Sequence, residues 1–177
     1  PVTYQAVASG YSPVTGTVNL SRSAIVLSGP FGLAQDFFTT VGSADVQLTV
    51  DAARIDSTGD IMEGQPIRAG YSVTVNITSS SPAVGTPVNV PVTLGGNVST
   101  GLAAFRSVGE GSTLLTVVQP SGFATPSWGD SLVGTVKVPG IVLSDGVALG
   151  NKLQAAGNLL LGRVAGPGGV AVTLTVD

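Results

Sequence analysis

The sequence predicts an all-β protein of the β-sandwich class. Short runs of alternating apolar and polar residues, rich in valine and threonine, recur along the 177 residues and are typical of half-buried strands. Glycine and proline supply 25 and 11 residues and lie between these runs, where they mark turns. The chain is 43% hydrophobic and 10% charged, which excludes a disordered chain because disorder needs low hydrophobicity and high charge.

The first part of the chain is expected to contain several short strands. Residues 2–8 alternate weakly and predict an edge strand, which belongs either to the chain's own sandwich or to the sheet of a neighbour; a loose linker explains the same residues. Further strands are predicted at residues 16–20, 24–28 and 45–51, separated by serine, glycine and proline breakers.

An aromatic segment follows the second of these strands. Residues 31–38 hold three of the five phenylalanines, namely Phe31, Phe37 and Phe38. Aromatic residues spaced so closely either line a core under a loop or form an exposed contact patch. Both interpretations stay open at this stage.

An acidic segment spans residues 51–64. Its carboxylates could supply the oxygen ligands that calcium prefers, although the spacing of an EF-hand loop is absent. A solvated hairpin turn explains the same composition, and no other cofactor is expected. The calcium candidates are Asp51, Asp56, Asp60 and Glu63.

The alternation is clearest between residues 70 and 127. Strands are predicted at residues 72–78, 88–94 and 113–118, with turns that contain Pro82 and Gly95 between them. Residues two apart on a strand share a face, so one face of each strand should be buried. The expected core residues are Val73, Val75, Ile77, Val90, Val92, Leu115 and Val117.

This central stretch resembles the immunoglobulin-like repeats of large bacterial surface proteins, of the adhesin or stalk type. The resemblance covers about residues 70–128 and lies in the strings SSSPAVGT, VPVTLGGN and VGEGSTLLTVVQPSGFATPS. It implies an immunoglobulin-like sandwich with a structural or adhesive role. The string VGTPVNVPVTL also resembles the opening strands of cohesin-type sandwiches, which would imply a binding module.

A weak internal repeat is present. The strings GTV and IVLS at residues 16–18 and 25–28 recur in the same order at residues 134–136 and 141–144. The two copies are 118 and 116 residues apart, and a repeat of this length suggests tandem sandwiches rather than a solenoid of short repeats. A chance match between valine- and threonine-rich strands explains the same strings.

The repeat leads to a predicted division of the chain into three parts. Residues 1–66 would be a first β segment, residues 67–130 an immunoglobulin-like core, and residues 131–177 a partial second repeat that completes or exchanges a sheet. Strands are predicted in this last part at residues 132–138 and 170–176.

Two aromatic residues, Phe123 and Trp128, flank a short Pro-containing loop. They could plug the space between two sheets or offer a sugar-stacking platform. Three Asn-X-Ser/Thr acceptor patterns for glycosylation are also present, at Asn19, Asn76 and Asn97.

Composition narrows the possible chemistry. The chain has no cysteine and no histidine, which removes thiol nucleophiles, disulfides and nearly all zinc, iron and copper sites. The net charge of −3, with scattered arginines and lysines, predicts no nucleic-acid partner. The chain has no apolar run of transmembrane length. It begins at Pro1 without a leader-like stretch, which is expected either of an exported chain whose leader has been removed or of a piece of a longer chain.

These observations favour a non-enzymatic, extracellular or cell-surface building block of a filament, stalk or adhesin. Its partners would be copies of itself or neighbouring repeats of a longer chain, joined through β-strand edges. A carbohydrate-binding or cohesin-like module is one alternative, and a virion shell or decoration protein, whose sandwich would be of the jelly-roll type, is the other. The expected assembly residues are Val2, Tyr4, Ala6, Val170, Val172, Leu174, Val176, Phe31, Phe37 and Phe38.

Overall fold

The computed structural model describes residues 1–143, 150–154, 159–162 and 168–175. Within these ranges the regular secondary structure consists of β-strands, with no helix, which confirms the predicted all-β class. No helix in the described part is therefore long and apolar enough to cross a membrane.

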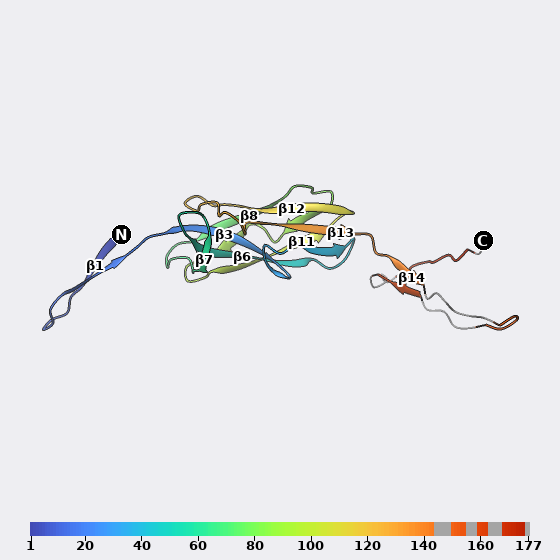
Figure 1. The fold of residues 1–177 in the computed structure, drawn as a ribbon, viewed down its shortest axis with the longest axis horizontal. Coiled ribbons are helices and arrows are strands. Elements are labelled where there is room, and N and C mark those ends of the chain that lie inside the picture. The colour runs from blue at the N-terminus through green and yellow to red at the C-terminus, as the bar shows by residue number, and fades with distance from the viewer. Residues whose placement is uncertain (144–149, 155–158, 163–167, 176–177) are drawn as a thin grey trace.

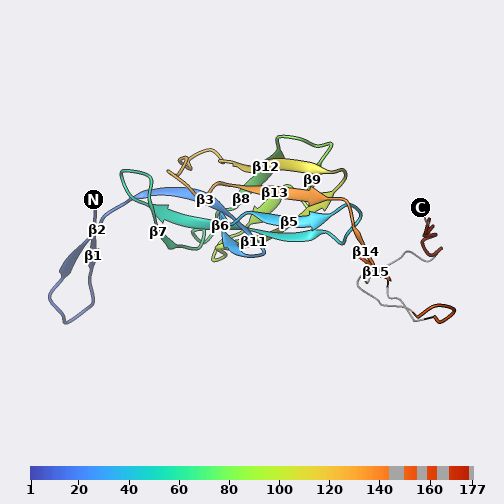
Figure 2. The same ribbon diagram turned by 45° about the vertical axis from the view of Figure 1, so that its right-hand side comes forward.

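The strands form three parts along the chain (Figure 1). An N-terminal hairpin consists of β1 (Val2–Ala6) and β2 (Val14–Val18). A central body contains β3 to β13, and a C-terminal pair consists of β14 (Ile141–Leu143) and β15 (Leu159–Leu161). Figures 1 and 2 show the N-terminal hairpin at one end of the elongated body and the C-terminal pair at the other.

The first sheet of the body has the strand order β4-β3-β6-β11-β9, with β7 paired to one end of β6. All of its pairs are antiparallel. Its strands are β3 (Arg22–Gly29), β4 (Gly32–Leu33), β6 (Val46–Ile55), β7 (Ile61–Gly64), β9 (Gly85–Val88) and β11 (Thr100–Ser107).

The second sheet has the order β10-β8-β12-β13-β5. Its last pair, β13 with β5, is parallel and joins the C-terminal strand of the body to a segment near its beginning. Its strands are β5 (Phe37–Thr40), β8 (Val73–Ser79), β10 (Val92–Leu94), β12 (Gly111–Val118) and β13 (Ser131–Lys137).

The two sheets share one hydrophobic core. Alternation on β8 turns Val75 and Ile77 inward, while Asn76 between them is exposed. Across the core, β3 contributes Ile25 and Leu27, both fully buried. Burial of apolar side chains from both sheets is the main stabilising contribution to this arrangement.

Five of the seven expected core residues are buried as predicted: Val75, Ile77, Val92, Leu115 and Val117. The other two, Val73 and Val90, are half-buried and pack against the core from its margin.

The predicted strand at residues 88–94 is divided in two. The chain pairs with β11 as β9, crosses between the sheets, and then pairs with β8 as β10. At the crossing, Asn89 has a positive φ of 59° and the Val90–Pro91 bond is cis. Because a left-handed residue cannot continue an extended strand, the alternation seen in the sequence spans two different sheets.

Other predicted strands and the predicted division of the chain differ from the structure. The strand predicted at residues 170–176 is absent from the described part of that range, residues 170–175. The strands β1, β2 and β13 lie close to their predicted positions. Strands from all three predicted segments share the two sheets of the body, so the sheets do not follow the boundaries at residues 66 and 130. The two copies of the repeated GTV string do not occupy equivalent positions, because one lies in the hairpin strand β2 and the other in the body strand β13.

The loop at residues 119–130 covers the outer edge of β3. The backbone N–H of Ala124 donates to the carbonyl of Ser23, at 2.7 Å, and the N–H of Leu27 donates to the carbonyl of Gly129, also at 2.7 Å. Between them, the side chain of Gln119 bonds to Ile25. The loop thus satisfies backbone groups that an open sheet edge would expose.

Candidate functional site

The N-terminal hairpin has one apolar and one polar face. Its register pairs Val2 with Val18, Tyr4 with Gly16 and Ala6 with Val14, and directly paired residues share a face. The opposite face carries only polar side chains, those of Thr3, Gln5, Thr15 and Thr17.

The apolar face of this hairpin is open. Tyr4 is 57% exposed and Val14 is 66% exposed, and no third strand of the described chain pairs with β1 or β2. The ring of Tyr4 lies over Gly16, where an added Cβ would come within 2.5 Å of a ring carbon. An isolated two-stranded hairpin is at best marginally stable in water, so this face is suited to a contact with another surface.

The C-terminal end of the molecule is also apolar. In the β14–β15 pair, Ile141 is opposite Leu161, and Ile141 and Leu160 are exposed. Further along, Val170 and Leu174 are exposed and Val172 is half-buried, in a stretch that alternates like a strand but forms none in residues 170–175. The remaining assembly candidate of this segment, Val176, lies outside the described residues.

The aromatic segment is divided between the core and the surface. Phe37, at the start of β5, is buried and makes an edge-to-face contact with Phe105, with ring centroids 5.3 Å apart. Phe37 was expected to be an assembly residue, but because it is buried it cannot contact another subunit. Phe31 and Phe38 are exposed on the surface, with centroids 6.3 Å apart. Phe38 faces outward because successive residues of a strand point to opposite faces.

Two of the four carboxylates of the acidic segment, Asp56 and Asp60, share the hydroxyl of Thr58, and the other two have partners of their own. Glu63 pairs with Arg54 at 2.9 Å, and Asp51 accepts a hydrogen bond from the Thr100 hydroxyl. Within the described part of the chain, no three acidic side chains gather in a geometry suited to a metal ion.

Asp56 organises the turn between β6 and β7. One of its oxygens, Oδ1, accepts hydrogen bonds from the N–H groups of Thr58, Gly59 and Asp60, each at 2.9 Å, and from the Thr58 hydroxyl. These bonds, the one from the Thr58 hydroxyl foremost, lower the pKa of Asp56 from its ordinary value of 3.8. This geometry corresponds to the solvated hairpin turn that was the alternative to a calcium site.

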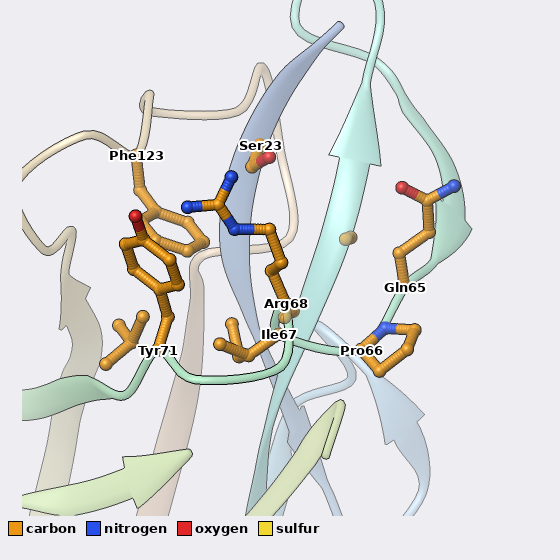
Figure 3. A pocket seen from close by; sticks show the side chains of 10 residues that line it. Ser23, Gln65, Pro66, Ile67, Arg68, Tyr71 and Phe123 are labelled. Atoms are coloured by element: carbon orange, nitrogen blue, oxygen red, sulfur yellow. The ribbon is translucent and has the colours of Figure 1, made fainter. Parts of the chain in front are cut away.

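A pocket of about 300 Å³ lies beside the covered edge of β3 (Figure 3). Ala52 and Ile67 at its base are buried, and Phe123 is half-buried and packs against the core. The exposed side chains of Arg68 and Tyr71 stand at its mouth. Figure 3 shows Gln65 and Pro66 on the side away from Tyr71 and Phe123.

Of the residues that line this pocket, sequence reasoning singled out Phe123 as a packing or binding aromatic, and it named Val73 only as a core residue. The tryptophan that was considered with Phe123, Trp128, is exposed and does not line the pocket, so Phe123 alone packs toward the core. A signal for Arg68 and Tyr71 was present in the turn sequence Arg68-Ala69-Gly70-Tyr71, which places a cation three residues from an aromatic ring.

The three glycosylation candidates, Asn19, Asn76 and Asn97, are all exposed.

No family model and no curated protein matches the chain. Two solved structures from one surface-layer protein are similar to it. The first is described as the crystal structure of the S-layer protein SbsC domains 4 and 5, with a TM-score of 0.46 and 17% identity over 77% of this chain and 65% of that one. The second, surface layer protein SbsC domains 1–6, has a TM-score of 0.46 and 15% identity over 75% of this chain and 16% of that one. Likeness at this level does not establish a family.

Proposed function

We propose that this chain is a non-enzymatic structural unit of an extracellular or cell-surface assembly, such as a filament, stalk or adhesin. Its units would join through their terminal strands, either to copies of the same chain or to neighbouring repeats of a longer one. The observation that carries the proposal is the β1–β2 hairpin, which projects from one end of the body and has an open apolar face.

The finer fold that we propose is an immunoglobulin-like sandwich. In that fold one sheet has the order A-B-E-D and the other contains C-F-G. The order β3-β6-β11-β9 fits the first sheet, and β8-β12-β13 fits the second. The parallel β5–β13 pair extends the second sheet by one strand.

The positions of the two ends favour contacts between different units. The N-terminal hairpin and the C-terminal segments project from opposite ends of the body (Figures 1 and 2), so they cannot meet within one molecule while the body stays folded. A contact between the front of one unit and the back of the next is heterologous, and contacts of this kind build rings or open filaments.

The outer strands of the body offer less pairing surface than its ends. The edge of β3 is covered by the loop at residues 119–130. Among the other edge strands, β10 has three residues, β4 has two and β5 has four, and β9 contains Pro87, which cannot donate to a ladder. Short strands and proline are common ways to protect sheet edges. The ends are thus the more favourable joining surfaces.

The test compares charges placed on the two faces of the hairpin. We expect the double variant Tyr4→Lys with Val14→Lys to abolish assembly, because it puts two charges on the apolar face. The matched variant Thr3→Lys with Thr15→Lys adds the same charge to the polar face and should leave assembly intact. Sedimentation velocity and electron microscopy of negatively stained protein would measure the outcome. Equal assembly of both variants would contradict the proposal, as would a parent protein that stays monomeric at every concentration.

A further inference from the structure

The pocket between β3, residues 65–73 and Phe123 has the features of a small-molecule site. Its volume, about 300 Å³, lies at the lower end of the range for ligand pockets, which are mostly apolar and contain a few polar groups. Ala52, Ile67, Val73 and Phe123 supply apolar surface, and Ser23 and Gln65 add polar groups to the lining.

A tight turn holds the cation at the mouth of this pocket. The N–H of Tyr71 donates to the carbonyl of Arg68 at 3.1 Å, and Gly70 between them has a φ of 79°, the geometry of a type II turn. The turn brings the guanidinium carbon of Arg68 to 3.9 Å from the centroid of the Tyr71 ring. This stacking orients the guanidinium plane while its N–H edge stays available.

The backbone under the turn is closely packed. A Cβ on Gly96 would lie 2.9 Å from the Cα of Ala69 and 3.1 Å from the carbonyl oxygen of Arg68. Ile67 also exchanges hydrogen bonds with the neighbouring loop, to Val98 at 2.9 Å and from Asn97 at 2.7 Å. The turn is therefore preorganised, which reduces the entropy that binding has to overcome.

The charges around the pocket are unbalanced. Its lining contains one cation, Arg68, and no carboxylate. Arg54 and Arg106 pair with Glu63 and Asp45, whereas the guanidinium of Arg68 makes no hydrogen bond or ion pair with any described residue.

We propose that this pocket binds a small organic carboxylate whose body is a single six-membered ring. The carboxylate would accept hydrogen bonds from the N–H edge of Arg68, a fork geometry that suits planar carboxylates. The ring would lie against the apolar surface formed by Ile67, Val73 and Phe123. An aromatic acid and an acidic sugar share this chemistry. The inference does not depend on the assembly proposed above.

Nuclear magnetic resonance titration of the full chain tests this inference with two acids and their neutral counterparts. We expect benzoate or glucuronate to cause saturable shifts in the backbone amide signals of Ile67, Arg68 and Tyr71. Benzamide and glucose should bind at least about tenfold more weakly, because a hydrogen bond to a charged group contributes more than a neutral one. A stronger response to benzoate indicates an aromatic acid, and a stronger response to glucuronate indicates an acidic sugar.

Variants then test the role of Arg68. Because this side chain is exposed, Arg68→Gln should fold normally and weaken binding of the responding acid by at least about tenfold. Arg106→Gln removes the same charge away from the pocket and should leave binding unchanged. The inference is overturned if neither acid gives saturable shifts, if the neutral molecules bind as tightly as the acids, or if Arg68→Gln binds like the parent.

Discussion

The side chain of Gln119 bonds to both main-chain polar groups of Ile25. The N–H of Ile25 donates to Oε1 at 2.9 Å, and Nε2 donates to the carbonyl of Ile25 at 2.7 Å. A single amide side chain therefore takes the place of a neighbouring strand at a residue that is fully buried.

The first prediction follows from this pair. Gln119→Ala should lower the free energy of unfolding by about 1–3 kcal/mol, because it leaves two backbone groups of a buried residue without partners. Urea denaturation would measure the loss. The control is Gln47→Ala on the exposed face of β6, which should change stability little. A Gln119 variant as stable as the control would mean that water replaces the amide.

The second prediction concerns the core face of β8. Val75→Asp should cost several kcal/mol and abolish cooperative unfolding, because Val75 is fully buried and an unpaired charge is poorly tolerated there. Asn76→Asp introduces the same charge one residue further along, on the exposed face. Thermal unfolding followed by circular dichroism should show a normal transition for Asn76→Asp and none for Val75→Asp.

The third prediction is steric. A Cβ on Gly85 would lie 2.1 Å from the Cζ atom of Phe105 and 2.8 Å from the carbonyl oxygen of Arg106. Because the carbonyl belongs to the paired strand β11, it cannot move away easily, and Gly85→Ala should destabilise the body by about 1–3 kcal/mol. Gly95→Ala is the control, since no atom beyond its two chain neighbours lies within 4 Å of its Cβ position. Equal melting temperatures of the two variants would contradict this packing.

The fourth prediction is a pH dependence at the β6–β7 turn. The pKa of Asp56 is lowered from 3.8 because its carboxylate accepts hydrogen bonds, the one from the Thr58 hydroxyl foremost. A carboxyl whose pKa is lower in the folded state stabilises the fold above its unfolded pKa, and this contribution is lost as the pH falls through the folded pKa. We expect the amide signals of Thr58, Gly59 and Asp60 to move toward positions typical of open loops below about pH 3.8.

The variant Asp56→Asn isolates this effect. It keeps an acceptor oxygen but removes the titrating group, so the acid-dependent movement of the three amide signals should disappear. A movement that persists in the variant would mean that the titration of Asp56 does not cause it.

Sequence reasoning identified the parts of the fold whose physical signal is local. The alternation in β8 and β12 predicted which side chains face the core, and four of the five buried residues it named lie on these two strands. By contrast, β11 was missed because Ala103, Ala104 and Phe105 are buried in succession, which removes the two-residue period. A strand protected on both faces gives no such period.

The candidate sites depended on long-range arrangement and were harder to predict. Ser23, Arg68 and Phe123 come from three distant segments, so no spacing in the sequence indicated that they line one pocket. The roles of Phe37 and Phe38 could not be separated before the strand and its faces were known. The contribution of the terminal segments to assembly remains a prediction.

The parallel pair β5–β13 determines how the body would respond to a pulling force. The chain enters the body at β3 and leaves it after Lys137 at the opposite end (Figure 1). Phe37–Thr40 pairs with residues 134–137 close to that exit. Tension between the two ends would act along these parallel strands and load their hydrogen bonds together, in shear, instead of opening them one after another. Such a pair would resist tension along the long axis of the body better than a pair whose hydrogen bonds open one after another.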